Sequence, residues 1–152
     1  MYNKIGDNMK LAIASDHRGY ELKDYLKKNL KKYDVIDLGT NSKAMVDYPD
    51  YAFKLGEYIV KNNCLGVVIC GSGLGISIAC NKVKGVRCAK VNSIKDAIYT
   101  KEDNNANVIS ISANIKKERA LKIVTSFIES EFTGEERHIR RINKISEYER
   151  SN

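Results

Sequence analysis

The stretch VVICGSGLGISIACNK, at positions 67–82, combines a strand pattern, a glycine loop and a helix pattern. A run of apolar, mostly β-branched residues ends at Cys70, and glycines follow at 71, 73 and 75. The helix pattern begins at about Ile76. An apolar strand that leads through a tight turn into a helix is the unit from which parallel α/β sheets are built. The stretch therefore predicts one βα unit of such a sheet.

The same alternation of strand and helix patterns runs along the rest of the chain. The predicted strands cover 10–14, 35–38, 65–70, 85–91 and 107–112, and the predicted helices cover 19–32, 50–62 (beginning near Pro49), 76 onward, 93–103, 115–132 and a last basic segment at 137–151. Apolar strands without polar alternation indicate a sheet that is covered on both faces. We therefore expect an α/β fold, a Rossmann-like three-layer α/β/α sandwich with a five-stranded parallel sheet and an extra C-terminal helix.

Length and composition fit a single domain. The chain has 152 residues, 43% hydrophobic and 30% charged, which is enough to bury a core. No linker, repeat or low-complexity tract interrupts 9–152, and we expect 1–8 to be a flexible extension. No apolar run approaches the roughly 18 residues of a membrane span, and no export signal is visible. These features predict a cytoplasmic protein with no membrane partner.

Cysteine and histidine spacing argues against a metal site. The four cysteines lie at 64, 70, 80 and 88 without a CxxC pair, and the two histidines are far apart in sequence. We expect free thiols, with Cys64, Cys80 and Cys88 as small core residues.

The net charge of +7 raises the question of a nucleic-acid partner. We interpret the lysines of 19–32 instead as the solvated face of a helix, opposite an apolar stripe of Leu22, Tyr25, Leu26 and Leu30. This solvated face would hold Lys23, Lys27, Lys28, Lys31 and Lys32. No aromatic-basic stacking motif accompanies the charge, so we expect no nucleic-acid partner.

Polar residues follow the strands at the edge where parallel α/β sheets bind ligands. Asp16 and His17 follow the first strand, Cys70 ends the third, and Asn114 follows the fifth. The glycine loop after Cys70 fits neither the GxGxxG dinucleotide motif nor a P-loop. Its backbone N–H groups suit a small oxyanion, although a merely tight turn is the alternative.

A cysteine at this point has two chemical uses if it is not core filler. The following helix N-terminus favours the thiolate form of Cys70, which then acts as a nucleophile or as a base at carbon. Acyl transfer needs a histidine oriented by a third group, and the adjacent Asp16 and His17 are poorly placed for such a dyad. Proton abstraction at carbon needs only a base and donors that hold an enediolate, which the glycine loop offers.

The last predicted helix carries Arg137, His138 and Arg141 at spacings that place them on one face. Two guanidinium groups on one helical face can clamp a phosphate. A solvated basic helix end is the alternative.

Several motifs together resemble the B-type ribose-5-phosphate isomerase family, which also contains the galactose-6-phosphate isomerase subunits. They are SDHRGYELK, LGT, DYPDYA, CGSGLGISIACNK, NNANV and the RHxxR near the C-terminus. The resemblance extends from Met9 to about Tyr148. It implies an aldose–ketose isomerase, without metal or cofactor, that acts on a phosphorylated sugar through a cis-enediolate.

The resemblance also implies roles for individual residues. Cys70 would move the proton between C1 and C2, Ser72 would assist at the hydroxyl oxygens, and the N–H groups of Gly71, Gly73 and Gly75 would hold the enediolate. Asp16, Tyr48 and Asn104 would contact the sugar, and His17, Arg137, His138 and Arg141 the phosphate. The family shares each site between two subunits, which implies a homodimer or a dimer of dimers.

Three positions depart from the family pattern. Asp103 stands where the pentose enzymes usually have the histidine that opens the furanose ring, and Lys101 replaces an arginine. Asn114 replaces an arginine that helps to hold phosphate in relatives. We hypothesise that Arg18 partly supplies that missing charge, and that Asp103 has a role in ring opening.

Ribose 5-phosphate is the expected substrate. A hexose 6-phosphate of the galactose or allose type is the alternative, because the stretch DAIYTKEDNNANV is closer to the galactose-6-phosphate enzymes. A sugar-phosphate-binding protein without turnover is a further alternative, and a basic nucleic-acid module a more distant one. Retention of Cys70 argues against a mere binder, since binding needs no base.

Overall fold

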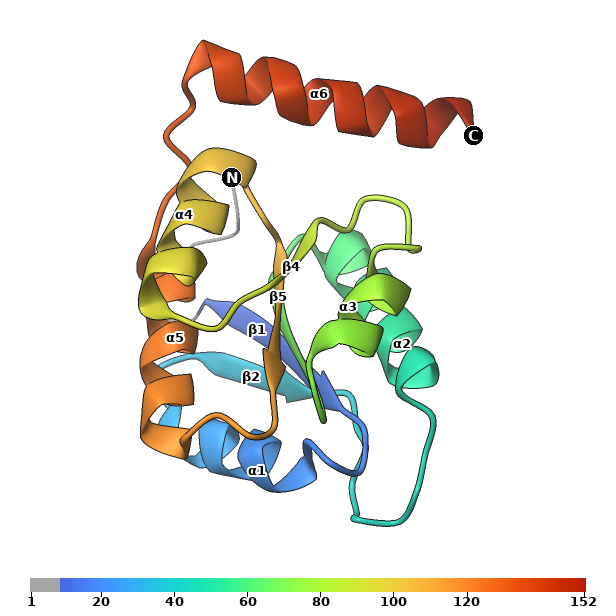
Figure 1. Cartoon of the computed structure of the whole chain (residues 1–152), viewed down its shortest axis with the longest axis vertical. Helices are drawn as coiled ribbons and strands as arrows, with labels where there is room; N and C mark the ends of the chain where they lie inside the picture. The colour runs from blue at the N-terminus through green and yellow to red at the C-terminus, as the bar shows by residue number, and fades with distance from the viewer. Residues whose placement is uncertain (1–8) are drawn as a thin grey trace.

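The computed structural model describes residues 9–152, and the extension predicted at 1–8 lies outside the described residues. Its strands are β1 (Lys10–Ser15), β2 (Asp34–Asp37), β3 (Leu65–Cys70), β4 (Cys88–Lys90) and β5 (Val108–Ser112). They form one sheet in the order β2-β1-β3-β5-β4, and every pair is parallel (Figure 1). The predicted five-stranded parallel sheet is confirmed.

Helices cover both faces of the sheet. They are α1 (Tyr20–Asn29), α2 (Tyr48–Asn62), α3 (Leu74–Cys80), α4 (Ile94–Asn104), α5 (Lys117–Glu129) and α6 (Glu136–Ser151). Helices α1, α4 and α5 pack on one face, α2 and α3 pack on the other, and α6 lies across one end of the molecule (Figure 1). The three-layer sandwich with an extra C-terminal helix is therefore confirmed.

The central strand β3 divides its side chains between the two cores. Leu65, Val67 and Ile69 pack with α1, α4 and α5, whereas Val68 and Cys70 belong to the core on the α2 and α3 side. Successive side chains of a strand point to opposite faces, so the sequence LGVVIC fixes this division. Cys70 consequently ends the strand on the face that α2 and α3 cover.

The edge strand β4 is shorter than the segment 85–91 predicted from sequence. Gly85 has φ of 91°, and the Val86 N–H donates to the Val83 carbonyl in a turn. The Arg87 N–H donates to the Asn107 side chain at 2.7 Å, and the strand begins one residue later. A local turn and a side-chain acceptor thus replace the first ladder bonds.

Lys23 is a correction to the predicted solvated face of α1. Its side chain is only 1% exposed, and its ammonium group lies 2.6 and 2.7 Å from the two carboxylate oxygens of Asp37. Lys27 also donates to Asp37, at 2.7 Å. Burial alone would raise the pKa of Asp37, but the bonds from Lys23, Lys27 and the Gly39 N–H outweigh it and hold that pKa below its usual value. The prediction was wrong because the partner, at the end of β2, is not visible from the helix pattern.

Candidate active site

The segments that follow β1, β3 and β5 meet at the carboxyl edge of the sheet. The Asp16 N–H donates to the Ile69 carbonyl at 3.1 Å, and the Ala113 N–H donates to the Cys70 carbonyl at 2.9 Å. These bonds continue the parallel ladders past the strand ends. Residues that are distant in sequence are therefore held around Cys70.

The glycine loop wraps around the thiol of Cys70. The side chain is buried, and its Sγ accepts a hydrogen bond from the Gly73 N–H at 3.2 Å. Gly73 has φ of 78°, and a Cβ there would lie 2.9 Å from the carbonyl carbon of Ile111. The loop reaches this geometry because position 73 has no side chain.

Two serines of β5 hold the glycine loop by hydrogen bonds to its carbonyl groups. The sequence analysis did not assign them this role. The Ser112 hydroxyl donates to the Gly71 carbonyl at 2.7 Å, and the Ser110 hydroxyl donates to the Gly73 carbonyl. Asn114 adds a longer contact of 3.5 Å to the Gly71 carbonyl. Hydroxyls at alternate positions of an otherwise apolar strand, VISIS, are the signal that points to one shared polar face.

The turn after β1 is organised by Asp16 and His17. Oδ1 of Asp16 accepts from the N–H groups of Arg18 (2.9 Å) and Gly19 (3.1 Å), which fixes the start of α1. Nδ1 of His17 accepts from the Val46 N–H at 3.2 Å. In the neutral ring Nε2 then carries the hydrogen and remains the donor. His17 is thereby anchored to the loop that precedes α2.

Tyr48 and Arg18 both lie against the glycine loop. A Cβ at Gly75 would be 2.6 Å from Cζ and 2.8 Å from the hydroxyl oxygen of Tyr48. A Cβ at Gly71 would be 2.9 Å from Cδ and Nη1 of Arg18. These two glycines thus make room for a phenol and a guanidinium group. Ser72 stands exposed at the tip of the loop, where its hydroxyl accepts from the Leu74 N–H at 3.1 Å.

The other predicted site residues lie at the amino edge of the sheet. Asp103 and Asn104 end α4, just before β5 begins. Nε2 of His138 on α6 lies 3.4 Å from Oδ1 of Asp103. Arg137 pairs with Glu135 at 3.0 Å, and Arg141 is exposed.

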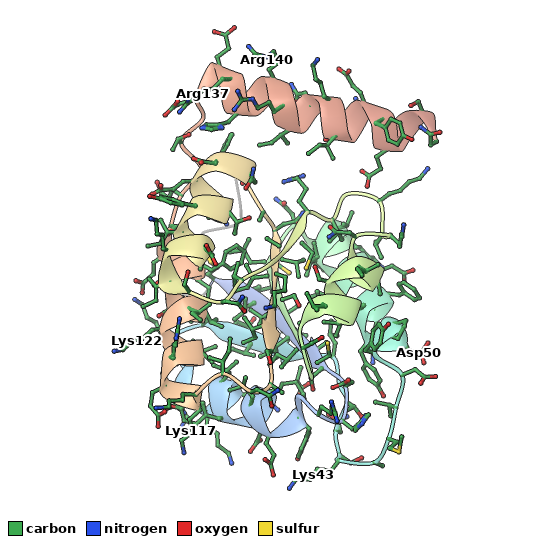
Figure 2. All side chains as sticks on the ribbon, viewed as in Figure 1. Lys43, Asp50, Lys117, Lys122, Arg137 and Arg140 are labelled. Atoms are coloured by element: carbon green, nitrogen blue, oxygen red, sulfur yellow. The ribbon has the colours of Figure 1, made fainter. Side chains whose placement is uncertain are left out.

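One chain therefore does not bring all the predicted site residues together. Cys70 pairs in register with Ser112 and Gly66 with Val108, so the length of β5, about 13 Å, separates the two edges. Helix α6 lies at the opposite end of the molecule from the turns of the carboxyl edge (Figure 1). Figure 2 likewise shows Arg137 far from Lys43, which belongs to the loop that His17 contacts.

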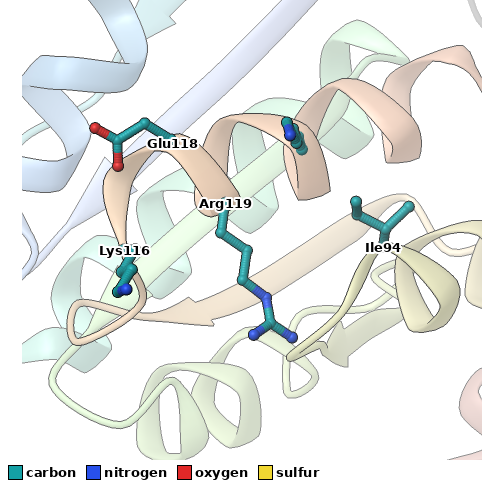
Figure 3. A pocket seen from close by; sticks show the side chains of 5 residues that line it. Ile94, Lys116, Glu118 and Arg119 are labelled. Carbon is teal, nitrogen blue, oxygen red and sulfur yellow. The ribbon is translucent and has the colours of Figure 1, made fainter.

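Two hollows lie near the carboxyl edge but apart from the glycine loop. One, of about 490 Å³, lies between α4 and α5 and is lined by Ile94, Lys116, Glu118, Arg119 and Lys122 (Figure 3). Arg119 crosses it to donate to the Asn92 carbonyl at 2.9 Å. The other, of about 190 Å³, is lined by residues of α1 and of the segment after β5. Neither lining includes Cys70, so neither hollow belongs to the site around its thiol.

Within residues 9–152, no group of three or more histidine, cysteine, aspartate or glutamate side chains is arranged to hold a metal ion. The four cysteines are free, and Cys64 and Cys80 are buried as predicted, whereas Cys88 is half-buried. None of the described helices is both long enough and apolar enough to span a membrane.

Comparison with known proteins gives a consistent result. The model of the Ribose/Galactose Isomerase family matches residues 11–145. A probable ribose-5-phosphate isomerase B of Mycoplasma pneumoniae is 43% identical, over 94% of this chain and 97% of that protein. The ribose-5-phosphate isomerase B of Mycobacterium tuberculosis is 38% identical, over 94% and 91%.

Solved structures agree with the sequence relatives. Ribose-5-phosphate isomerase B of Clostridium thermocellum has a TM-score of 0.90 and 44% identity, over 94% of this chain and 99% of that chain. The Mycoplasma genitalium enzyme, solved with bound ribulose-5-phosphate, has a TM-score of 0.91 and 41% identity, over 97% and 100%. The chain is thus an isomerase that belongs to the ribose/galactose isomerase family, with the B-type ribose-5-phosphate isomerases as its relatives.

Proposed function

We propose that the chain interconverts ribose 5-phosphate and ribulose 5-phosphate. The observation that carries the proposal is the buried Cys70 thiol with the Gly73 N–H on its sulfur, inside a glycine loop of this family. A base that is paired with backbone donors suits transfer of a proton between two adjacent carbons. The choice of substrate rests on the names of the sequence relatives and of the solved structures, which are ribose-5-phosphate isomerases.

The proposed reaction begins with the open-chain aldose. The Cys70 thiolate removes the proton from C2, and the electron pair forms the C1–C2 double bond as the aldehyde oxygen becomes an enediolate oxygen. Backbone N–H groups of Gly71, Gly73 and Gly75 hold the charge that develops. Ser72 assists proton movement between the two oxygens. Cys70 then returns its proton to C1, which gives the ketose and restores the thiolate.

The remaining residues are proposed to hold the substrate. Asp16 and Tyr48 contact sugar hydroxyls beside the loop, and His17 donates from Nε2 to the phosphate. Asn104 contacts the sugar, while Arg137, Arg141 and His138 contact the phosphate. Because these last four lie at the amino edge, they would act in the site of another subunit.

We propose that two subunits pair so that α6 of one reaches the glycine loop of the other, as a homodimer or a dimer of dimers. Three observations support this arrangement. Helix α6 lies outside both layers (Figure 1), its Arg137 and Arg141 are exposed, and so are its apolar residues Ile139, Ile145 and Tyr148. Exposed apolar groups in one stretch are typical of an interface.

The reaction is tested by NMR in deuterium oxide. The protein is given ribose 5-phosphate, allose 6-phosphate and galactose 6-phosphate in turn, beside a Cys70→Ala control. We expect turnover of ribose 5-phosphate, with deuterium at the carbon that receives the proton and no reaction in the control. Turnover of a hexose 6-phosphate but not of ribose 5-phosphate would mean that a hexose 6-phosphate is the substrate. Binding of a sugar phosphate without turnover of any of the three would mean that the protein is a sugar-phosphate-binding protein and not an isomerase of these sugars.

The shared site is tested by mixing two inactive variants. Cys70→Ala and Arg141→Ala subunits are unfolded together, refolded and compared with each variant refolded alone. In a mixed dimer one site combines the intact Cys70 of one subunit with the intact Arg141 of the other. We expect activity to appear only in the mixture, at up to about a quarter of the wild-type level by random pairing. No gain on mixing would mean that each site lies within one chain.

A further inference from the structure

Two of the four cysteines meet where α3 packs against the edge strand β4. Cys80 is the last residue of α3 and is fully buried, whereas Cys88 begins β4 and is half-buried. Cys80 belongs to the core on the α2 and α3 side of the sheet, and Cys88 packs against that core. The two thiols form a hydrogen bond, which together with burial raises the pKa of Cys80 well above its usual value. The reaction proposed at Cys70 uses neither of them.

Asn81 holds the two cysteines together through the backbone. Its side chain accepts from the Cys88 N–H at 2.8 Å and donates to the Cys88 carbonyl at 2.9 Å. Because Asn81 directly follows Cys80, these two bonds keep the backbone of Cys88 against the end of α3. The Cys80 thiol also donates weakly to the Ala52 carbonyl of α2, at 3.8 Å, so its sulfur is fixed from a second side.

The other two cysteines are too far from Cys88 to pair with it. Cys70 ends β3 at the carboxyl edge, whereas Cys88 begins β4 at the amino edge. Cys64 precedes β3, and β5 lies between β3 and β4, so two strand spacings of about 4.8 Å separate Cys64 from Cys88. A disulfide needs Cα atoms within about 7 Å of each other. Of the four cysteines, Cys80 is therefore the one that can form a bond to Cys88.

We propose that Cys80 and Cys88 form a thiol pair that hydroperoxides oxidise to a reversible disulfide between α3 and β4. The pair is independent of the proposed function, because neither residue is placed in the site around Cys70. The half-buried Cys88 is the sulfur that an oxidant reaches, and the buried Cys80 is the resolving thiol beside it. A thiol already in contact with an oxidised sulfur closes the disulfide before a second oxidant arrives.

The oxidation balances in atoms and electrons. The Cys88 sulfur attacks one oxygen of hydrogen peroxide, the O–O bond breaks, and the departing oxygen takes the thiol proton and leaves as water. Cys88 is then a sulfenic acid. The Cys80 sulfur attacks the Cys88 sulfur, and the hydroxyl on Cys88 leaves with the Cys80 proton as a second water. Two thiols have lost two electrons to one peroxide, and a dithiol reductant reverses the change by thiol–disulfide exchange.

The disulfide would close a loop that contains residues 81–87. This loop includes Gly85, whose N–H donates to the Glu149 carboxylate of α6 at 2.9 Å. Because the two thiols are already in contact, the bond needs only a small approach of the two sulfurs. A closed loop restricts the unfolded chain, so the oxidised protein should resist unfolding better than the reduced protein.

The test is oxidation with hydrogen peroxide followed by peptide mapping. Remaining thiols are alkylated, and trypsin is added without reductant. Trypsin releases Cys88 in the peptide 88–90 and Cys80 in the peptide 62–82. The variants are Cys80→Ala and Cys88→Ala. Cys64→Ala is the matched control, because Cys64 lies on the same tryptic peptide as Cys80 and in the same core.

We expect wild type and Cys64→Ala to give the peptides 62–82 and 88–90 joined, with a mass lower than their sum by two hydrogen atoms. Dithiothreitol should separate them again. Cys80→Ala should give no link and should gain oxygen at Cys88, whereas Cys88→Ala should leave Cys80 unoxidised. The urea midpoint of wild type should rise on oxidation and fall again on reduction, and the midpoint of Cys88→Ala should not change.

Other outcomes overturn the inference. Oxygen gain at Cys88 in wild type without a link would mean that the two thiols react separately, and thiols that stay free after peroxide would mean that their contact is structural. A link that persists in Cys80→Ala would assign the partner of Cys88 to another cysteine. A link that leaves the urea midpoint unchanged would contradict the expected stabilisation. None of these measurements uses isomerase activity, so failure of the thiol pair and failure of the proposed function are distinguishable.

Discussion

The sulfur of Cys70 lies 3.2 Å from the backbone nitrogen of Gly73, which donates a hydrogen bond to it. The contact joins the end of β3 to the left-handed position of the glycine loop, where φ is 78°. Burial raises the pKa of Cys64, the cysteine that precedes the same strand, and keeps that thiol neutral. The two thiols therefore differ in environment although both are buried.

This difference predicts that Cys70, and not Cys64, carries the reaction. We expect Cys70→Ala to lower kcat by about 10²–10⁴-fold, the usual contribution of a general base. Cys64→Ala should leave kcat within about twofold, because Cys64 precedes β3 and therefore lies at the opposite edge of the sheet from the glycine loop. Steady-state kinetics of both variants, with circular dichroism to check folding, make the measurement. Equal losses would assign the effect of both substitutions to packing.

Gly73 is expected to be intolerant of any side chain. Gly73→Ala places a Cβ 2.9 Å from the Ile111 backbone and also imposes a left-handed conformation on alanine. Gly134→Ala imposes a similar conformation, with φ of 70°, but its Cβ meets nothing within 4 Å. We expect Gly134→Ala to cost about 1 kcal/mol of unfolding free energy and Gly73→Ala at least about 1 kcal/mol more. Urea unfolding of the two variants measures the difference, and equal costs would contradict the close approach.

Arg18 is expected to contribute to phosphate binding. Its guanidinium group lies against Gly71, next to Cys70. We expect Arg18→Ala to raise KM for ribose 5-phosphate about tenfold with little change in kcat, as for loss of one charged hydrogen bond. Arg18→Lys should give an intermediate KM. An unchanged KM in Arg18→Ala would dismiss the hypothesis that it compensates for Asn114.

Asp37 is expected to support the fold through buried Lys23. Asp37→Asn leaves that ammonium group without its charged partner, and we expect a loss of about 3 kcal/mol in unfolding free energy. Asp24→Asn breaks the exposed pair with Lys28 and should leave the unfolding midpoint nearly unchanged. Chemical unfolding of both variants tests the contrast between the two pairs.

The lowered pKa of Asp37 also predicts that the fold is less stable in acid. The pKa of Asp37 lies lower in the folded state than in the unfolded chain, where it is about 4. Its stabilisation is therefore fully present above about pH 4 and is lost as the pH falls through the folded-state value. Acid unfolding followed by circular dichroism should shift to higher pH in Asp37→Asn. An identical acid transition would mean that the pair contributes little.

Lys101 predicts that stability rises with pH in the alkaline range as well. Burial, with the nearby positive charge of Arg87, lowers the pKa of Lys101 to about 8. Between about pH 8 and 10.5 the unfolded chain therefore binds more protons than the folded one, so stability should rise with pH. Urea unfolding at pH 7.5 and 9.5 should show this rise relative to Lys101→Met, which lacks the titrating group. The same pH dependence in wild type and in Lys101→Met would mean that titration of Lys101 does not contribute to stability.

The sequence alone determined the architecture and the chemistry of one edge. Strand and helix periods are local, and β3 with its glycine loop was assigned from consecutive residues. Parallel strands bring their carboxyl ends to one edge, so the meeting of Asp16, Cys70 and Asn114 followed from topology. The family motifs added roles for residues, and these roles stay predictions.

Only the tertiary structure decided which side chains meet across elements. The α1 pattern placed Lys23 in solvent, but Asp37 at the end of β2 draws it inside. The sequence pattern of β5 did not predict that its serine hydroxyls donate hydrogen bonds to the Gly71 and Gly73 carbonyls. The structure also assigned the α6 residues to the amino edge and set His138 beside Asp103. Such contacts depend on the packing of whole helices and strands, whereas a sequence pattern reports only which face of its own element a residue occupies.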